Sequence, residues 1–426
     1  MQKSSTFTIP NFYEFKIQLL NWVSQFNSFC FLDNQQYHFD NPNFECLVAA
    51  GCKKSSTLQS GNAFEQLKTF AKANNEWLFG HLGYDLKNET EQLTSQNFDE
   101  LQFADVHFFV PKIVLQLTKT SLTIFSDDES ASDIFNAILT SSNKINEEPT
   151  PKITIKNRLS KEAYLQTIEK LRQHITKGDC YEINFCQEFY AENAVINPLA
   201  IYSKLSNASP TPFSGFYKVD DKYGICASPE RYLKKEGNKI ISQPIKGTAK
   251  RSKNSAEDEC NKTELRNSPK ERSENVMVVD LVRNDLSRVC KQGSVKVEEL
   301  FGIYSFPQVH QMISTIVGEV DDDVHWTDIV KHTFPVGSMT GAPKKRVMQL
   351  IEQYEKTKRG LFSGAIGYVT PSGNFDFNVV IRSILYNATN KYLSFTTGGA
   401  ITFNSNAESE YAESMLKAEV MKRVLE

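Results

Sequence analysis

Beyond residue 160 the sequence alternates short strand-like runs with longer segments of helical spacing, and this pattern limits the possible folds. Strand-like runs occur at 181–189, 215–217, 239–242, 364–369, 378–386 and 392–397, and helical spacing at 161–177, 269–290, 343–355 and 407–425. Several strand-like runs follow one another closely enough to form hairpins. The pattern predicts antiparallel sheets covered by helices, an α/β fold of the α+β kind.

The length of 426 residues predicts two domains or one large unit with a less regular first part. The segment 126–152 is rich in polar residues and is typical of a connector between lobes. We therefore predict an N-terminal lobe at 1–150, available for partner or regulatory contacts, and a second domain at 151–426.

Charge and cysteine usage exclude several classes of function. The net charge of -3 with interspersed signs provides no basic face for nucleic acid and no polybasic patch for a membrane. The N-terminus has no apolar secretory core, and no later apolar run is long enough to span a bilayer, so a cytoplasmic location is expected. Eight cysteines without a Cys-x-x-Cys pair argue against a zinc or redox motif. A small molecule is the expected partner.

Two helical segments each open with a pair of glutamates three residues apart, Glu271 with Glu274 and Glu410 with Glu413. This spacing puts both carboxylates of a pair on one helical face. Each pair also has a structural explanation, as a capping box or as part of a surface ion pair. If the two faces met, they would form an all-oxygen site suited to Mg²⁺, and no His or Cys at ligand spacing favours zinc.

Other candidate residues lie in loops and strand-like runs. The loop 337–344 precedes a helix whose first N–H groups can bind a carboxylate, with Pro343 at the first helical position. The segment 397–400 follows a strand and contains two glycines that let the backbone approach a ligand. His310 and Arg382 lie on strand-like runs, where structural pairing and anion binding are alternative roles.

A lysine and a glutamate lie on neighbouring strand-like segments. Lys246 lies in an apolar segment before a Gly-Thr turn, where a lysine is usually just solvated. Glu230 begins the hairpin that leads into that segment, so the amine and the carboxylate can converge.

Taken in order, these motifs resemble those of the chorismate-utilising enzymes. The match rests on Ser-Pro-Glu230, Pro-Ile-Lys246-Gly-Thr, Glu271-x-x-Glu274, the Asp280–Asp285 segment, Gly337–Lys344, Ile366-Gly-Tyr368, Ile381-Arg382-Ser, Gly398-Gly-Ala400 and Glu410-x-x-Glu413. The resemblance covers residues 155–426 and touches the first lobe only through Gly83-Tyr-Asp-Leu86. It implies two antiparallel β-sheets packed in a sandwich flanked by helices, as in the anthranilate synthase component I fold, with 151–426 as the chorismate-binding catalytic domain.

Lys246 indicates the branch of the family. Anthranilate synthases carry Ala where Lys246 stands, whereas the aminodeoxychorismate branch has Pro-Ile-Lys-Gly-Thr. The resemblance therefore implies a transferase that converts chorismate and ammonia to 4-amino-4-deoxychorismate, for para-aminobenzoate and folate synthesis. Anthranilate synthase component I and a non-catalytic chorismate-binding subunit remain the alternatives.

The chemistry explains why a lysine matters. A nucleophile that attacks ring C2 expels the C4 hydroxyl, so ammonia acting directly leaves nitrogen at C2. An enzyme amine that attacks C2 first lets ammonia attack C4 as the amine departs. We therefore predict that Lys246 is a transient covalent nucleophile, kept neutral by burial and nearby charge. Glu230 is predicted to protonate the departing hydroxyl and later to deprotonate the incoming ammonia.

The resemblance also implies a metal site and a substrate pocket. Magnesium is expected on Glu274 and Glu413, with Glu271 and Glu410 beside them, where it binds the ring carboxylate. Tyr368 and Arg382 are expected to hold the enolpyruvyl carboxylate, and His310 to lie near C4. The rest of the expected pocket is formed by Gly247, Thr248, Thr340, Gly398, Gly399, Ala400 and Lys417, although Lys417 also suits an ion pair with Glu413.

Four features refine these expectations. Glu182 stands where water-using relatives carry a base lysine and amino-transferring ones usually glutamine, which argues against isochorismate or salicylate synthesis. Ala400 stands where relatives often have glycine. The chain lacks the Gly-x-Cys-x-Gly segment of a glutaminase, so ammonia is expected from a glutamine amidotransferase partner. The tryptophan-feedback motif of anthranilate synthases is not evident, which argues against that regulation.

Overall fold

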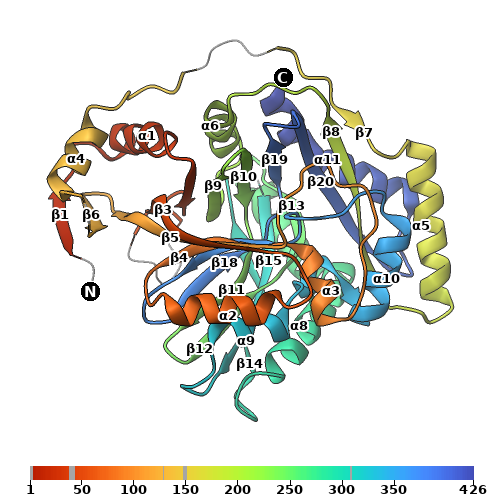
Figure 1. Ribbon diagram of the computed structural model, residues 1–426. Coiled ribbons are helices and arrows are strands. Elements are labelled where there is room, and N and C mark those ends of the chain that lie inside the picture. Colours follow the sequence, from red (N-terminus) through yellow and green to blue (C-terminus); the bar gives the residue numbers. More distant parts are fainter. Residues whose placement is uncertain (1–2, 38–43, 128, 147–150, 308) are drawn as a thin grey trace.

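Strand pairing organises the whole fold. The computed structural model describes residues 3–37, 44–127, 129–146, 151–307 and 309–426 (Figure 1). Within these ranges the named strands form one connected network in which each pairing is antiparallel, and two branches of the network diverge at β5 (Val106–Leu117).

The first branch contains most of the N-terminal strands. Its order is β1 (Ser4–Thr8), β6 (Ser121–Ser126), β5, β3 (Cys46–Leu58), β2 (Ser28–Asp33), β9 (Phe213–Val219), β10 (Lys222–Ser228), β19 (Ser383–Asn387), β20 (Tyr392–Ile401) and β8 (Glu182–Ala191). The short strands β7 (Lys156–Asn157) and β16 (Gly341–Ala342) both pair with β8.

The second branch leaves β5 through its first residues. Its order is β4 (Leu78–Leu82), β17 (Ala365–Val369), β18 (Phe375–Asn378), β11 (Arg231–Glu236), β12 (Lys239–Gln243) and β15 (Val309–Glu319). Both β13 (Ile245–Lys250) and β14 (Lys296–Ser305) pair with β15.

The two branches pack face to face around a shared apolar core. Leu47 and Tyr217 of the first branch belong to the same buried cluster as Leu233 and Ile316 of the second. Burial of such side chains is the main favourable contribution to folding. The predicted sandwich of antiparallel sheets is therefore confirmed.

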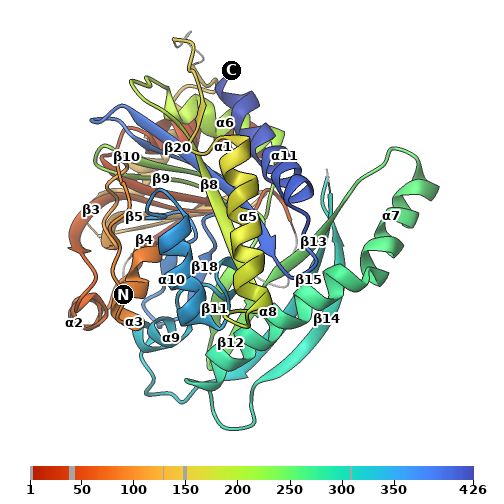
Figure 2. The ribbon, with the colours of Figure 1, turned by 90° about the vertical axis from the view of Figure 1, so that its right-hand side faces the viewer.

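Helices cover the outer faces of both branches (Figures 1 and 2). The first branch is covered by α1 (Phe12–Val23), α4 (Ala131–Leu139), α6 (Pro198–Ala208) and α11 (Ala407–Leu425), and the end of β8 by α5 (Lys161–Thr176) and α10 (Lys344–Tyr354). The second branch is covered by α2 (Ala63–Ala73), α8 (Pro269–Ser287) and α9 (Trp326–Thr333). The helix α7 (Ser255–Asn267) projects from the rest, as Figure 2 shows. No described helix is both long and apolar enough to cross a bilayer.

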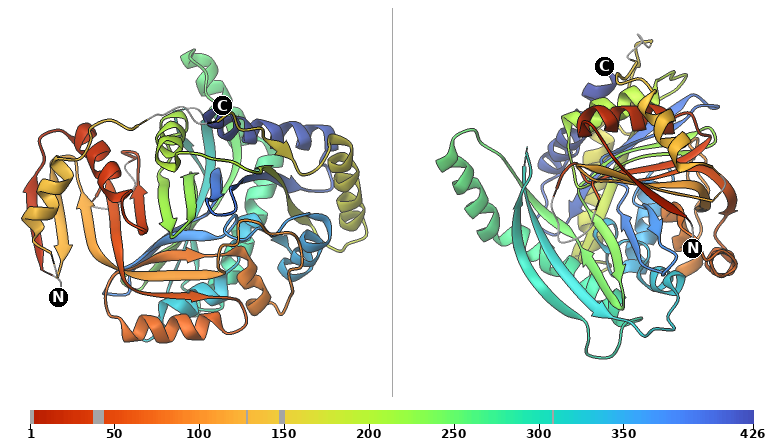
Figure 3. Two further views of the ribbon diagram at one scale, coloured as in Figure 1. Left: turned by 45° about the horizontal axis from the view of Figure 1, so that its top comes forward. Right: turned by 90° about the vertical axis from the view of Figure 1, so that its left-hand side faces the viewer.

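Strands from the first 150 residues are hydrogen-bonded to strands of the later part. β2 pairs with β9 and β4 pairs with β17, and Figure 3 shows red and orange strands beside green and blue ones. The predicted boundary near residue 150 lies outside the described residues. The polar segment predicted as a connector contains α4.

The predicted helices are confirmed as α5, α8, α10 and α11, but three local predictions are wrong. The run 378–386 is broken between β18 and β19, where Arg382 has φ +48°, a left-handed value that a strand does not accommodate. The segment 397–400 lies inside β20 and does not follow a strand. Pro343 precedes α10 as its N-cap and is not its first helical residue.

Candidate active site

A buried ion pair joins β13 to β8. The Nζ atom of Lys246 donates a hydrogen bond of 2.8 Å to Oε1 of Glu182, and the two side chains are only 11% and 3% exposed. Glu182 begins β8, and its backbone pairs with Ala342 of β16. The second carboxylate oxygen of Glu182 is buried and has no hydrogen-bond partner among the described residues. Lys246 is thus held inside the protein and is not solvated.

Three carboxylates control the charge of Lys246. Burial opposes the charged amine, but Glu182, Glu274 and Glu230 outweigh this effect and raise the pKa of Lys246 above its ordinary value. The sequence hypothesis needed a neutral amine. Because the surrounding charge works in the opposite direction, the resting amine carries a proton that it must lose before it can attack an electrophile.

Glu230 lies in the turn between β10 and β11 and is almost fully buried. The hydroxyl of Ser338 donates a hydrogen bond of 2.6 Å to its Oε1 atom. Burial raises the pKa of Glu230 to about 7, although Ser338 and Lys246 oppose this shift. A carboxyl group with this pKa can hold a proton at neutral pH and give it to a leaving group.

The four glutamates predicted to bind metal lie on α8 and α11. Their negative charges raise the pKa of Lys270 although burial opposes this, and Lys270 Nζ lies 3.9 Å from Glu274 Oε1. Burial raises the pKa of Glu274 to about 7, and it also raises the pKa of Glu271 and of Glu410. The carboxylates of α8 and α11 therefore form a region of concentrated negative charge, and Lys270 lies next to it.

This carboxylate cluster has the donor type that Mg²⁺ prefers. The Oε1 atom of Glu274 is buried and has no hydrogen-bond partner among the described residues. Gly399 leaves room for Glu410, since the Oε2 atom of Glu410 would lie only 3.0 Å from a Cβ at position 399. Within the described ranges no three acidic, His or Cys side chains gather closely enough to hold a metal ion. The donors therefore fit magnesium, whereas a complete coordination shell is not assembled.

A separate pocket with about 290 Å³ of empty space contains Arg382. Pro229, which precedes Glu230, and Gln311 of β15 also line it. The guanidinium of Arg382 has no hydrogen-bond or ion-pair partner among the described residues, and burial lowers its pKa. An unpaired arginine in a cavity is suited to binding a carboxylate.

Gln311, and not His310, faces this cavity. His310 is 1% exposed and its ring nitrogens lie 2.8 Å from Ser305 Oγ and 3.1 Å from Asp258 Oδ1, so its bonding capacity is used within the protein. Successive residues of a strand point to opposite faces. Gln311 lines the cavity, and its Oε1 atom is buried without a partner among the described residues. The structure thus does not bring His310 to the site.

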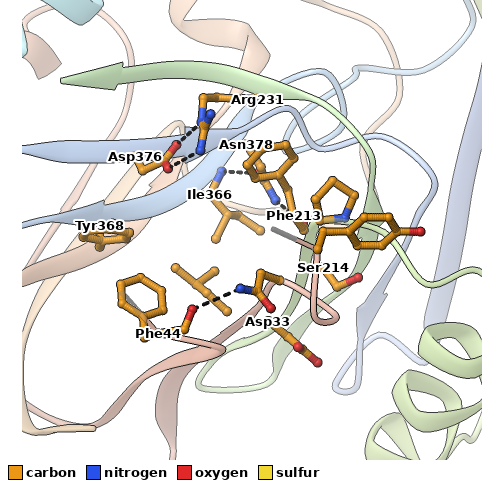
Figure 4. Close-up of a pocket in the computed structure, with 13 residues that line it drawn as sticks. Asp33, Phe44, Phe213, Ser214, Arg231, Ile366, Tyr368, Asp376 and Asn378 are labelled. Atoms are coloured by element: carbon orange, nitrogen blue, oxygen red, sulfur yellow. Dashed lines mark hydrogen bonds and ion pairs between the residues drawn. The ribbon is translucent and has the colours of Figure 1, made fainter. Parts of the chain in front are cut away.

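Tyr368 lines a different and larger cavity, of about 540 Å³ (Figure 4). Its ring lies about 6 Å from those of Trp77, Phe79 and Phe44, and burial raises its pKa. The Arg231–Asp376 ion pair lines the same cavity. Because Arg382 lines the smaller cavity, the structure does not place these two residues together as a carboxylate clamp.

The remaining predicted residues fall into two groups. Gly247 has φ +94° and passes so close to Glu271 that the Oε2 atom of Glu271 would lie 3.0 Å from a Cβ at position 247. Thr248 is exposed and is the register partner of Gln311 in the β13–β15 pairing. Lys417 donates to Glu413 at 2.7 Å and to Gly398 O at 3.0 Å, so the predicted ion pair is present.

The other group consists of backbone segments and one hydroxyl. Gly398, Gly399 and Ala400 pair with β8 opposite residues 184–186. Thr340 is fully buried, and its hydroxyl donates to Gly337 O at 3.0 Å. The hydroxyl of Thr340 therefore stabilises the loop to which it belongs, whereas the hydroxyl of Ser338 in the same loop donates to Glu230.

Sequence reasoning missed three residues of this region: Ser338, Gln311 and Lys270. Ser338 lies inside a quoted motif, and Gln311 is next to a named histidine. A strand register for residues 309–319 would have separated the two faces and pointed to Gln311. Lys270 lies between the capping serine of α8 and Glu271, where a basic residue gives no signal of its own.

Comparisons with known proteins identify the family. A family model described as chorismate binding enzyme matches residues 27–423. Aminodeoxychorismate synthase component 1 from Bacillus subtilis is 34% identical over 361 residues, 82% of this chain and 76% of that protein. An anthranilate synthase component I-like protein from Synechocystis is 33% identical, covering 82% and 72%. The structure of anthranilate synthase component I from Streptococcus pneumoniae matches with a TM-score of 0.78 at 25% identity, covering 91% and 94%. The chain belongs to the family of chorismate-binding enzymes.

Replacing Arg382 by methionine tests the predicted contact between this arginine and a carboxylate of chorismate. Loss of that charge-assisted hydrogen bond is expected to raise the KM for chorismate on the order of 10- to 100-fold. The melting temperature should not fall, since Arg382 has no partner within the described part of the chain. Steady-state kinetics and thermal unfolding measure both effects.

Arg359→Met is the matched control, because Arg359 is a buried arginine whose bonds run to Glu355 and to two backbone carbonyls. It should lower the melting temperature, since it leaves Glu355 buried without its partner. If Arg382→Met behaved like this control, Arg382 would be a structural residue.

Proposed function

We propose that this chain is the chorismate-aminating subunit of an aminodeoxychorismate synthase and replaces the C4 hydroxyl of chorismate by an amino group. The observation that carries the proposal is the placement of Lys246: a buried amine beside the carboxylates of Glu182 and Glu230. The curated relatives named aminodeoxychorismate synthase component 1 support it.

The reaction uses two successive allylic displacements. Lys246 attacks ring C2, the double bonds shift, and the C4–O bond breaks as Glu230 gives its proton to the departing hydroxyl, which leaves as water. Ammonia then attacks C4, the double bonds shift back, and the lysine amine leaves C2. The nitrogen at C4 gives its surplus proton to Glu230, which is ready for the next cycle.

Arg382 and Gln311 bind the substrate in this scheme. The guanidinium binds the enolpyruvyl carboxylate, while the amide oxygen of Gln311 accepts a hydrogen bond. The C4 hydroxyl is the only neutral hydrogen-bond donor of chorismate. Pairing it with Gln311 would satisfy a buried oxygen that otherwise has no partner in the described structure.

Magnesium would be held by Glu274 and Glu413, with Glu271 and Glu410 beside them, and would supply positive charge to the ring carboxylate. We expect titration calorimetry with MgCl₂ to detect one site, and Glu274→Gln to weaken it at least tenfold. Glu169→Gln, an exposed change on α5, is the control and should bind as the wild type does. Equal affinity in Glu274→Gln would remove Glu274 from the metal site.

Ammonia comes from a separate glutamine amidotransferase subunit in this proposal, since the chain has no Gly-x-Cys-x-Gly segment. The designation component 1 of the relatives is consistent with a second subunit. High concentrations of an ammonium salt should therefore replace the partner in an assay of the isolated chain.

The decisive experiment is a product assay. The purified chain is incubated with chorismate, MgCl₂ and an ammonium salt, and the products are separated by chromatography and identified by mass. 4-Amino-4-deoxychorismate is expected, and no pyruvate should form unless a lyase is added. Anthranilate with stoichiometric pyruvate would instead identify an anthranilate synthase, and absence of turnover a non-catalytic subunit.

A further inference from the structure

The contact between Lys246 and Glu182 offers a route for a proton. A primary amine attacks carbon only as the neutral base, yet the carboxylates around Lys246 favour its charged form. The mechanism therefore requires a group close to Lys246 Nζ that accepts the proton of the ammonium group. Glu182 is the one side chain in the described structure to which Lys246 Nζ donates a hydrogen bond, at 2.8 Å.

The surroundings of Glu182 suit this task. The side chain is 3% exposed, so bulk water does not compete for the proton. Its Oε2 atom has no hydrogen-bond donor within the described residues, which leaves the negative charge incompletely stabilised. Transfer of the proton replaces two buried charges by two neutral groups, which need less solvation than the charges do.

We infer that Glu182 takes the proton from Lys246 before the amine attacks chorismate and returns it when the amine leaves the ring. This inference rests on the proposed function, in which Lys246 is the nucleophile. It assigns a catalytic role to the position where amino-transferring relatives usually carry glutamine.

The proton balance closes within the site. An N–H bond of the Lys246 ammonium breaks and an O–H bond forms on Glu182 Oε1, so the ion pair becomes a neutral pair. The free electron pair of nitrogen then forms the bond to C2. When that bond breaks, the lysine leaves as a neutral amine and takes the proton back from Glu182. Glu230 exchanges its own proton with the C4 substituent.

Other charged groups surround the same amine. Besides Glu182 of β8, Lys246 interacts with Glu230 of the β10–β11 turn, with Glu274 and Glu271 of α8, with Glu413 of α11 and with the thiol of Cys186 of β8. Glu182 differs from these groups because it alone shares a described hydrogen bond with the amine. The proton transfer is therefore short and direct.

The pH dependence of kcat separates this role from a structural one. In the wild type the reactive neutral pair contains the same number of protons as the resting ion pair, so its population does not change with pH between the two titrations of the pair. In Glu182→Gln the amine must lose its proton to solvent. The reactive fraction then rises roughly tenfold per pH unit below the pKa of the lysine.

The test compares kcat for C4 amination in the wild type and in Glu182→Gln from pH 6.5 to 8.5, with saturating chorismate, MgCl₂ and a constant concentration of free ammonia. We expect the ratio of variant to wild-type kcat to rise close to tenfold per pH unit. The KM for chorismate should change less than threefold. A ratio independent of pH would overturn the inference, whatever its absolute value.

Glu188→Gln is the matched control, because Glu188 is a buried glutamate of the same strand that bonds to Arg158, Tyr392 and Ser394. The ratio of its kcat to that of the wild type should not change with pH.

Lys246→Ala distinguishes a failure of the inference about Glu182 from a failure of the proposed function. If it abolishes C4 amination while the Glu182→Gln ratio stays flat, only the role of Glu182 fails. If C4 amination persists in Lys246→Ala, the proposed function of Lys246 fails.

Discussion

Replacing Lys246 by alanine is expected to reduce C4 amination on the order of 10³-fold or more, because the variant lacks the nucleophile of the first displacement. Ammonia can then attack only C2 directly, into the space that the lysine side chain leaves. Residual turnover should therefore yield a C2-aminated product and, after loss of pyruvate, anthranilate. Chromatography with mass detection measures both products.

Lys250→Ala controls for this experiment, since Lys250 lies on the same strand, β13, and is exposed. It should leave rate and product unchanged. An unaltered product profile in Lys246→Ala would show that no covalent lysine step occurs. Because Lys246 is paired with Glu182, the variant leaves a buried carboxylate, and its folding should be verified by circular dichroism.

Glu230→Gln is expected to lower kcat by roughly 10²- to 10⁴-fold, the usual contribution of a general acid. The amide keeps the shape of the carboxyl group and can still accept the hydrogen bond from Ser338, so the KM for chorismate should change little. Since burial raises the pKa of Glu230 to about 7, its protonated fraction falls as pH rises through that value. The wild-type kcat should therefore decline above about pH 7.

The variant should lack this alkaline decline, because glutamine does not titrate. Glu236→Gln, an exposed change at the far end of β11, is expected to retain the wild-type profile. A Glu230→Gln enzyme with kcat within threefold of the wild type would remove the general acid from the mechanism.

The sequence predicted the strand and helix pattern well where one local signal decided it. Ser268 accepts a hydrogen bond from the Glu271 N–H at the start of α8, as the capping pattern indicates, and the same helix carries the Glu271 and Glu274 carboxylates. Capping and carboxylate clustering are thus compatible roles for one motif. Family motifs also located Lys246 and Glu230 in one region of the structure.

Contacts between residues far apart in the sequence could not be predicted from local patterns. Lys246 and Glu182 are 64 residues apart, and their contact depends on how β13 and β8 meet, which no local pattern encodes. The side on which a strand residue lies changes with each position, and the sequence motif alone did not show that Gln311, and not His310, lines the pocket that contains Arg382. Tyr368 shares a motif with family members, yet its ring packs with Trp77 and Phe79, because Tyr368 lies directly opposite Phe79 in the β17–β4 pairing and on the same face of the sheet.

The pairing of β2 with β9 and of β4 with β17 has a consequence for engineering. A truncated protein starting at residue 151 would leave one edge of β9 and one edge of β17 without a partner strand. The unpaired backbone donors and acceptors of these edges would promote self-association. The residues proposed to carry out the chemistry all lie after residue 151, but we do not expect that part of the chain to fold properly by itself. Shuffling or fusion should be done at whole-chain level, with junctions placed outside both of these strand pairs.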